Sequence, residues 1–152
     1  MSPARKNTDP DAAPDGGWTP EERAAMAERA AEVKAASRGR GKTDGAADLR
    51  AKIAEMAEPD RMLAERIAAL VAASAPTLAS RTWYGMPAWT RDGKVVCFFQ
   101  AAAKFGTRYA TFGFQHDALL DDGAVWPVAY AVTDLSDADA DRLAALIRRA
   151  AG

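Results

Sequence analysis

The spacing of apolar residues changes once along this chain, near residue 82, and the change limits the folds that the chain can adopt. Before it, apolar residues such as Leu63, Ile67 and Val71 recur at helical spacing. After it, residues 94–100 (KVVCFFQ) carry β-branched and aromatic side chains at odd and even positions alike, which is typical of a strand covered on both faces. The pattern predicts helices first and a sheet second.

Three helices are expected before the sheet and one after it. The sequence Thr-Pro-Glu-Glu that begins at residue 19 is typical of a helix start and predicts a helix over residues 19–38. Two more are expected over residues 44–57 and 59–74. A last helix should be capped by Ser136 and run to about Ala150, because aspartates in its first turn and arginines in its last turn complement the helix dipole.

The strands are expected to follow one another as antiparallel neighbours. Asp92-Gly93 is a hairpin turn signal, so Ala88–Thr90 and Lys94–Gln100 should pair. Residues 107–114 should form the next strand. Residues 125–132 should form another, which a proline restricts to an edge or a bulge. We therefore expect an α+β fold, an antiparallel β-sheet meander packed against helices.

The chain is expected to hold one domain with an N-terminal addition. Residues 1–17 are predicted to be a disordered tail, because they have no large apolar side chain after Met1. Residues 18–45 should form a helical extension and a linker, and the extension has a thin apolar stripe that predicts docking on the surface or mobility. Residues 46–152 should form the α+β domain.

Charge and composition exclude several classes of protein. The formal net charge is −1, which argues against a general nucleic-acid or membrane binder. A nucleic-acid role would depend on the basic stretch at residues 33–43 alone. No run of 18 apolar residues and no signal-peptide pattern occurs, and Cys97 is the one cysteine, so a cytoplasmic protein without disulfides is expected.

The sequence assembles no catalytic or strong metal-binding motif. The single histidine and the single thiol offer no nucleophile with its base, since Cys97 lies in an apolar strand and is expected to be inert. Tyr84 or Tyr109 could serve as a general acid, but no base partner is visible, so an enzyme is not favoured. The metal candidates for weak binding through oxygen ligands are His116, Asp117, Asp121 and Asp122. A solvent-facing acidic loop explains the same residues.

The segment RTWYGMPAW, residues 81–89, is the strongest candidate for a binding site. Gly85 allows a tight turn, and Pro87 favours an extended Met86, so the aromatic side chains could face a common space. Lys104 and Arg108 would add positive charge for an anionic ligand. The predicted ligand-binding residues are Trp83, Tyr84, Gly85, Met86, Pro87, Trp89, Phe98, Lys104 and Tyr109. The alternative is that these aromatic residues fill the helix–sheet interface.

The same segment carries a resemblance to a known family. Residues 82–89 (TWYGMPAW), 92–94 (DGK), Phe98-Phe99, Lys104 and 109–114 (YATFGF) resemble the YdhG-like family, also called domain of unknown function 1801, over residues 49–150. The resemblance implies a compact α+β domain with an antiparallel sheet, in a grouping with frataxin-like and YjbR-like domains. Some relatives are labelled iron chaperones, and the family supplies no agreed catalytic set.

Two functional hypotheses follow from these observations. The first is a non-enzymatic domain that binds a small ligand or a protein partner in an aromatic pocket around WYGMPAW, without a cofactor. The second is frataxin-like weak iron binding through the exposed carboxylates listed above, with iron as the bound metal. Neither hypothesis fixes the oligomeric state.

Overall fold

The sheet has five strands in the order of the chain, each antiparallel to the next. The computed structural model describes residues 17–37 and 45–152. The strands are β1 (Ala79–Trp83), β2 (Met86–Arg91), β3 (Lys94–Gln100), β4 (Ala110–Phe114) and β5 (Ala129–Val132). The predicted meander and α+β class are therefore confirmed. The predicted tail over residues 1–17 and the linker before Gly45 lie almost wholly outside the described residues.

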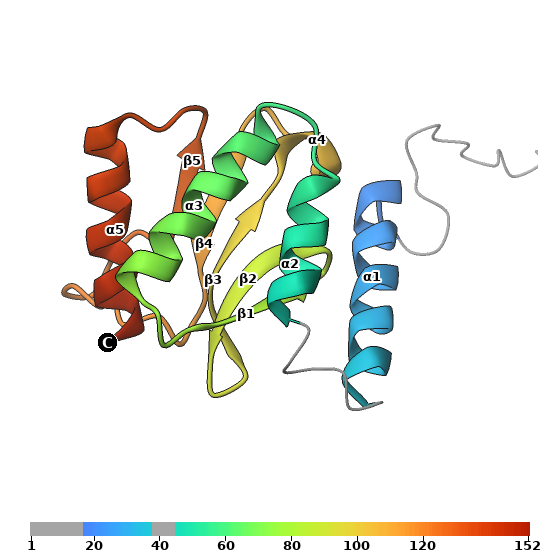
Figure 1. The fold of residues 1–152 in the computed structure, drawn as a ribbon, viewed down its shortest axis with the longest axis horizontal. Helices are drawn as coiled ribbons and strands as arrows, with labels where there is room; N and C mark the ends of the chain where they lie inside the picture. Colours follow the sequence, from blue (N-terminus) through green and yellow to red (C-terminus); the bar gives the residue numbers. More distant parts are fainter. Residues whose placement is uncertain (1–16, 38–44) are drawn as a thin grey trace, which may run out of the picture.

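The helices form the second layer of the fold. They are α1 (Pro20–Ser37), α2 (Gly45–Ala54), α3 (Asp60–Ser74), α4 (Ala102–Phe105) and α5 (Asp137–Ala151). Figure 1 shows α5, α3 and α2 side by side in front of the sheet, with α1 beyond α2 at the β1 edge. None of the helices in the described ranges has the length and apolar character needed to cross a membrane.

Several element boundaries differ from those expected. β1 was not foreseen, because its sequence ASRTW is polar at three of five positions and carries no strand signal of its own. The strand expected over residues 107–114 begins only at Ala110, since α4 and a left-handed Gly106 occupy the chain before it. The strand expected over residues 125–132 begins at Ala129, beyond Pro127, which lacks the N–H that a sheet requires.

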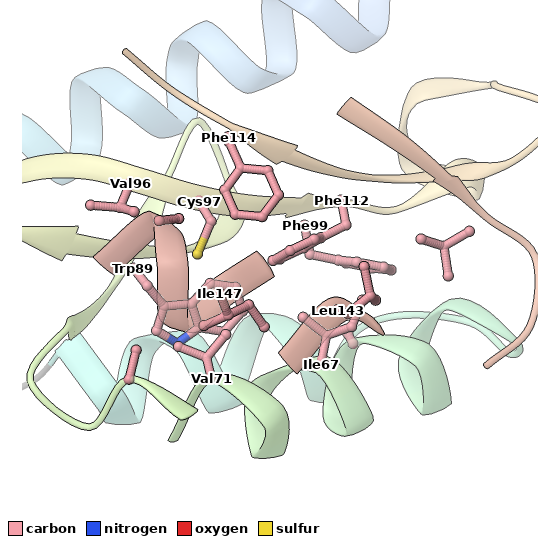
Figure 2. Packing of buried hydrophobic residues seen from close by; sticks show 14 of the residues in the cluster. Ile67, Val71, Trp89, Val96, Cys97, Phe99, Phe112, Phe114, Leu143 and Ile147 are labelled. Carbon is pink, nitrogen blue, oxygen red and sulfur yellow. The ribbon is translucent and has the colours of Figure 1, made fainter. Parts of the chain in front are cut away.

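The core lies between the helices and one face of the sheet. Trp89 pairs in register with Cys97, and Cys97 pairs with Phe114, so these side chains share that face. Figure 2 shows them with Phe99 and Phe112 pointing toward Ile67 and Val71 of α3. Burial raises the pKa of the Cys97 thiol to about 12, so the thiol stays protonated and packs as an apolar group.

The opposite face of the sheet carries a second, smaller aromatic cluster. Arg81 pairs with Ala88, Ala88 with Phe98, and Phe98 with Gly113, which places this row on the face away from the core. Phe98 lies over Gly113, where an added Cβ would come within 2.3 Å of the Phe98 ring. The glycine therefore makes room for an aromatic ring on the face that α2, α3 and α5 leave uncovered.

The last helix begins as the sequence predicts. Ser136 Oγ accepts a hydrogen bond from Asp139 N, and Asp139 Oδ2 accepts one from Ser136 N, each at 3.1 Å. This reciprocal pair is a capping box in which aspartate takes the place of the more common glutamate.

Arg91 joins β2 to the end of α5, and its removal should destabilise the fold. The half-buried guanidinium donates hydrogen bonds to the carbonyl oxygens of Ala150, Ala151 and Asp117. Arg91→Ala should lower the free energy of unfolding by about 1.5–3 kcal/mol, the range for hydrogen bonds to a charged group. Urea unfolding measures the loss. Arg149→Ala, which removes an exposed contact to the Asp121 carbonyl, is the matched control and should cost less than about 1 kcal/mol.

Candidate functional site

The tip of the β1–β2 hairpin is the centre of the predicted aromatic segment. Tyr84 and Gly85 connect the paired residues Trp83 and Met86, and both have a positive φ, at 52° and 73°. Two left-handed residues are what a type I′ hairpin turn requires. Glycine adopts this conformation freely, but for tyrosine it costs about 1–2 kcal/mol. A bulky residue in such a turn indicates that neighbouring groups hold the turn in place.

The structure brings several of the predicted site residues together at this tip. The Trp83 ring lies 5.2 Å from the Tyr84 ring and 5.4 Å from the Phe98 ring, centroid to centroid. Lys104 Nζ donates a hydrogen bond to the Gly85 carbonyl oxygen at 3.2 Å. Met86 is buried and directly opposite Trp83 in the hairpin.

The structure places the other predicted site residues elsewhere. Trp89 is 3% exposed and belongs to the core on the far face of the sheet from Trp83. Pro87 is fully buried and shares that face with Trp89, because strand side chains alternate. Tyr109 is 36% exposed immediately before β4, and the Arg108 guanidinium lies over its ring at 5.1 Å.

A groove of about 280 Å³ lies beside the hairpin on the uncovered face of the sheet. Its walls include Trp83, Arg81 from β1, Arg29 from α1, Lys94 from β3, and His116. The groove therefore combines one aromatic side chain and several cationic ones with the carboxylate of Asp117.

Two guanidinium groups give this groove its electrostatic character. Arg81 makes no ion pair within the described ranges, whereas Arg29 pairs with Glu32 at 3.5 Å and lies 5.8 Å from the Tyr84 ring. Burial and the charge of Arg29 lower the pKa of Arg81, against an opposing effect of Glu32. The groove therefore presents two neighbouring guanidinium groups, of which Arg29 is paired with the Glu32 carboxylate.

A cavity of about 320 Å³ lies on the helix side of the same hairpin. Lys52 of α2, Lys104 of α4 and Gly85 line it. Apolar groups such as Met56 and Ala101 and the carboxyl-bearing residues Glu55 and Asp60 complete its walls. The two lysines meet at one carboxylate that is contributed by α1. Two hollows thus flank the hairpin tip, and α1 contributes a charged side chain at each.

The carboxylate that Lys52 and Lys104 share belongs to Glu28 of α1. Its oxygens lie 2.6 Å from Lys104 Nζ and 3.1 Å from Lys52 Nζ. Burial acts to raise the pKa of Glu28, but the two ammonium groups outweigh it, and the net pKa lies below the ordinary value. The pKa of Lys52 is raised in turn, because its pairing with Glu28 and Glu55 exceeds the effect of burial. Glu28 therefore joins α1 to α2 and α4 through two ion pairs.

The candidate metal ligands do not form a cluster. His116 is exposed in the groove, the Asp117 carboxylate lies 4.0 Å from Lys94 Nζ, and Asp121 and Asp122 are exposed. Within residues 17–37 and 45–152, no three His, Cys, Asp or Glu side chains are placed to hold a metal ion.

Sequence reasoning named Lys104 as a binding residue but missed Arg81 and the charged residues that α1 contributes at both hollows. Arg81 is two residues before Trp83, and strand alternation would have placed both on one face if β1 had been recognised. Glu28, Arg29 and Glu32 belong to α1, and no pattern in the sequence indicated which face of that helix would meet the domain.

Comparisons with known proteins leave the family open. No protein-family model, curated protein or solved structure matches this chain. The resemblance of residues 49–150 to the YdhG-like family therefore stays a prediction.

Proposed function

We propose that this chain is a binding module for a small anionic ligand that also carries an apolar ring. The ligand occupies the groove between α1 and the uncovered face of the sheet. The observation that carries the proposal is the pair of neighbouring guanidinium groups of Arg29 and Arg81 beside Trp83, of which Arg81 has no ion-pair partner in the described residues.

The chemistry of these side chains supports a phosphate or carboxylate ligand. Arginine presents a planar fork of N–H donors that matches either group, and it remains charged next to another cation. Trp83 offers an apolar face for a ring and is already supported from one side by Phe98. The groove of about 280 Å³ is close to the lower size limit of small-molecule sites.

The side chains that line the groove favour binding over catalysis. His116 is the one histidine of the chain and lies exposed in the groove, with no hydrogen bond to an orienting group among the described residues. A general base usually depends on such a group for its orientation. Recognition of charge and shape is what the assembled residues can perform.

Adenosine monophosphate, benzoate and inorganic phosphate are suitable probes. The first two combine an anion with a ring, and the third is the anion alone. We expect the ring-bearing anions to shift the indole N–H signal of Trp83 in NMR spectra and to leave that of the buried Trp89 in place. Arg81→Ala should weaken their binding about 10–100-fold, as expected for losing hydrogen bonds from a charged group.

Arg108→Ala is the matched control for this experiment. It removes the same side chain from a position whose contact is the Tyr109 ring, outside the groove. Binding should be unchanged in this variant. Equal losses of affinity in the two variants would mean that net charge alone causes the effect, which would contradict a site at Arg81. Absence of any Trp83 shift at millimolar probe would refute the proposal.

A further inference from the structure

Two carboxylates of α1, those of Glu28 and Glu32, are held by donor groups from other elements of the domain. Glu28 is held by Lys52 and Lys104, which come from α2 and α4. Glu32 accepts hydrogen bonds from the backbone N–H groups of Tyr84 at 3.1 Å and Gly85 at 3.0 Å, one on each oxygen. Two acidic side chains one helical turn apart thus meet four donors at one corner of the domain.

The hairpin turn is shaped to receive an anion. Its two successive N–H groups point to the same carboxylate, an arrangement that in other turns binds anions. Gly85 leaves the space that the ion pair fills, because an added Cβ would lie 1.9 Å from Glu28 Oε2 and 2.2 Å from Lys104 Nζ. The turn N–H groups therefore hold Glu32 beside the lysines that hold Glu28.

Apolar contacts contribute little to the docking of α1. Ala25 is the buried residue of this helix among those with described side chains, and an alanine offers a small contact area. Met26 and Val33 are 37% and 52% exposed. The polar contacts of Glu28 and Glu32 therefore decide where α1 lies, and groups held mainly by ion pairs exchange readily with competing ions.

The cavity of about 320 Å³ extends from this corner into the domain. Its charged side is lined by Lys52 and Lys104, by Glu55, which lies 3.5 Å from Lys52 Nζ, and by the buried Asp60, which accepts a hydrogen bond from Ala103 N. Met56, Ala57 and Ala101 provide apolar walls. Its volume falls within the range of small-molecule sites. Glu28 of α1 contacts Lys52 and Lys104, but no residue of α1 lines the cavity itself. The apolar space next to the ion pair therefore remains available to a ligand.

We infer that this corner is a binding site for an organic acid, and that α1 is its tethered competitor. The carboxylate of the acid takes the place of Glu28 on Lys52 and Lys104, and its hydrocarbon body enters the cavity beside Met56. Binding releases α1 from the hairpin tip. Because α1 also carries Arg29 into the groove, release would weaken anion binding there, a consequence that rests on the proposed function. The acid site itself does not depend on it.

Hexanoate is the probe for this site, and the full-length chain is the protein to test. Glu28→Gln with Glu32→Gln removes both competing carboxylates and keeps the shape of the side chains. Hexanoate should bind this double variant about tenfold more tightly than it binds the unmodified chain, because a docked competitor reduces apparent affinity. Acetate, which has the carboxylate without the hydrocarbon body, should bind at least about tenfold more weakly than hexanoate.

Hydrogen exchange of residues 20–34 reports the position of α1 independently of the groove. We expect faster exchange in the Glu28→Gln, Glu32→Gln variant, and in the unmodified chain when hexanoate is added. Glu21→Gln with Glu22→Gln is the matched control, because it makes the same charge change on exposed residues of the same helix. Exchange and hexanoate affinity should be unchanged in that control.

Any one of four outcomes would overturn the inference. Two concern the Glu28→Gln, Glu32→Gln variant and hexanoate: no binding at all, or the same affinity as the unmodified chain. The other two are unchanged hexanoate binding after Lys52→Met with Lys104→Met, and unchanged exchange of α1 after the glutamate substitutions. Failure of the proposed function would appear instead as absent Trp83 shifts with adenosine monophosphate, while hexanoate still bound and released α1.

Discussion

Replacing Trp89 by alanine should lower the free energy of unfolding by about 3–5 kcal/mol, the range for truncating a large aromatic residue in a core. Trp89 is 3% exposed and packs with Leu49 of α2 and Val71 of α3 under the sheet. These helices cannot close the space without moving away from other core residues, so a cavity should remain. Chemical denaturation followed by circular dichroism measures the loss.

Trp83→Ala is the matched control, since it truncates the same side chain on the other face of the same hairpin. Trp83 is half-buried and contacts the Tyr84 and Phe98 rings, so its loss should cost about 1–2 kcal/mol. The same substitution should abolish the ring-dependent part of anion binding. Equal destabilisation by the two variants would contradict the separation of core and groove described above.

These two tryptophans show how far the sequence determines the fold. The hydrophobic period and the Asp92-Gly93 turn predicted the β2–β3 hairpin, and the structure confirms it with Arg91 opposite Lys94 and a positive φ at both turn residues. Local chemistry is sufficient for such a turn, because both of its residues favour that conformation. It was not sufficient for β1, whose strand conformation depends on pairing with β2 and packing against α2.

The division of the aromatic segment between two faces follows from strand alternation once the register is known. A two-residue turn joins Trp83 to Met86, and a hairpin with this pairing places Trp89 on the other face. The sequence analysis instead expected one bend that turned both tryptophans toward a common space. Gly85, Met86 and Pro87 are compatible with several positions of the turn, so the residues alone did not fix it. Register was the missing information, and it is set by the long-range pairing of the sheet.

The acidic residues that α1 contributes are beyond sequence reasoning for a different reason. Glu28 and Glu32 are spaced for one helix face, but so are other acidic pairs on exposed helices, which are usually solvated. What distinguishes them is the partner set of Lys52, Lys104 and the hairpin turn, brought together from three separate elements. Only tertiary structure joins groups that lie so far apart in the chain.

Gly85→Ala should destabilise the protein more than Gly93→Ala and should also detach α1. Both glycines have a positive φ, 73° and 78°, so each alanine pays a similar conformational penalty of about 1 kcal/mol. They differ in their surroundings. A Cβ at Gly93 meets nothing within 4 Å, whereas a Cβ at Gly85 falls on the Glu28 carboxylate and the Lys104 ammonium group. The difference between the variants therefore isolates the ion pair at the hairpin tip.

The added loss at Gly85 should be about 1–3 kcal/mol, as for other substitutions that overfill a close contact. Hydrogen exchange in residues 20–34 should also become faster, because Glu28 must leave the lysines to make room for the added methyl group. Gly93→Ala should leave exchange of α1 unchanged, and thermal unfolding of both variants supplies the stability difference. If Gly85→Ala lost no more stability than Gly93→Ala and kept α1 protected, then Glu28 would have an alternative position in the docked state. The turn and the lysines would then hold α1 without the close fit at Gly85.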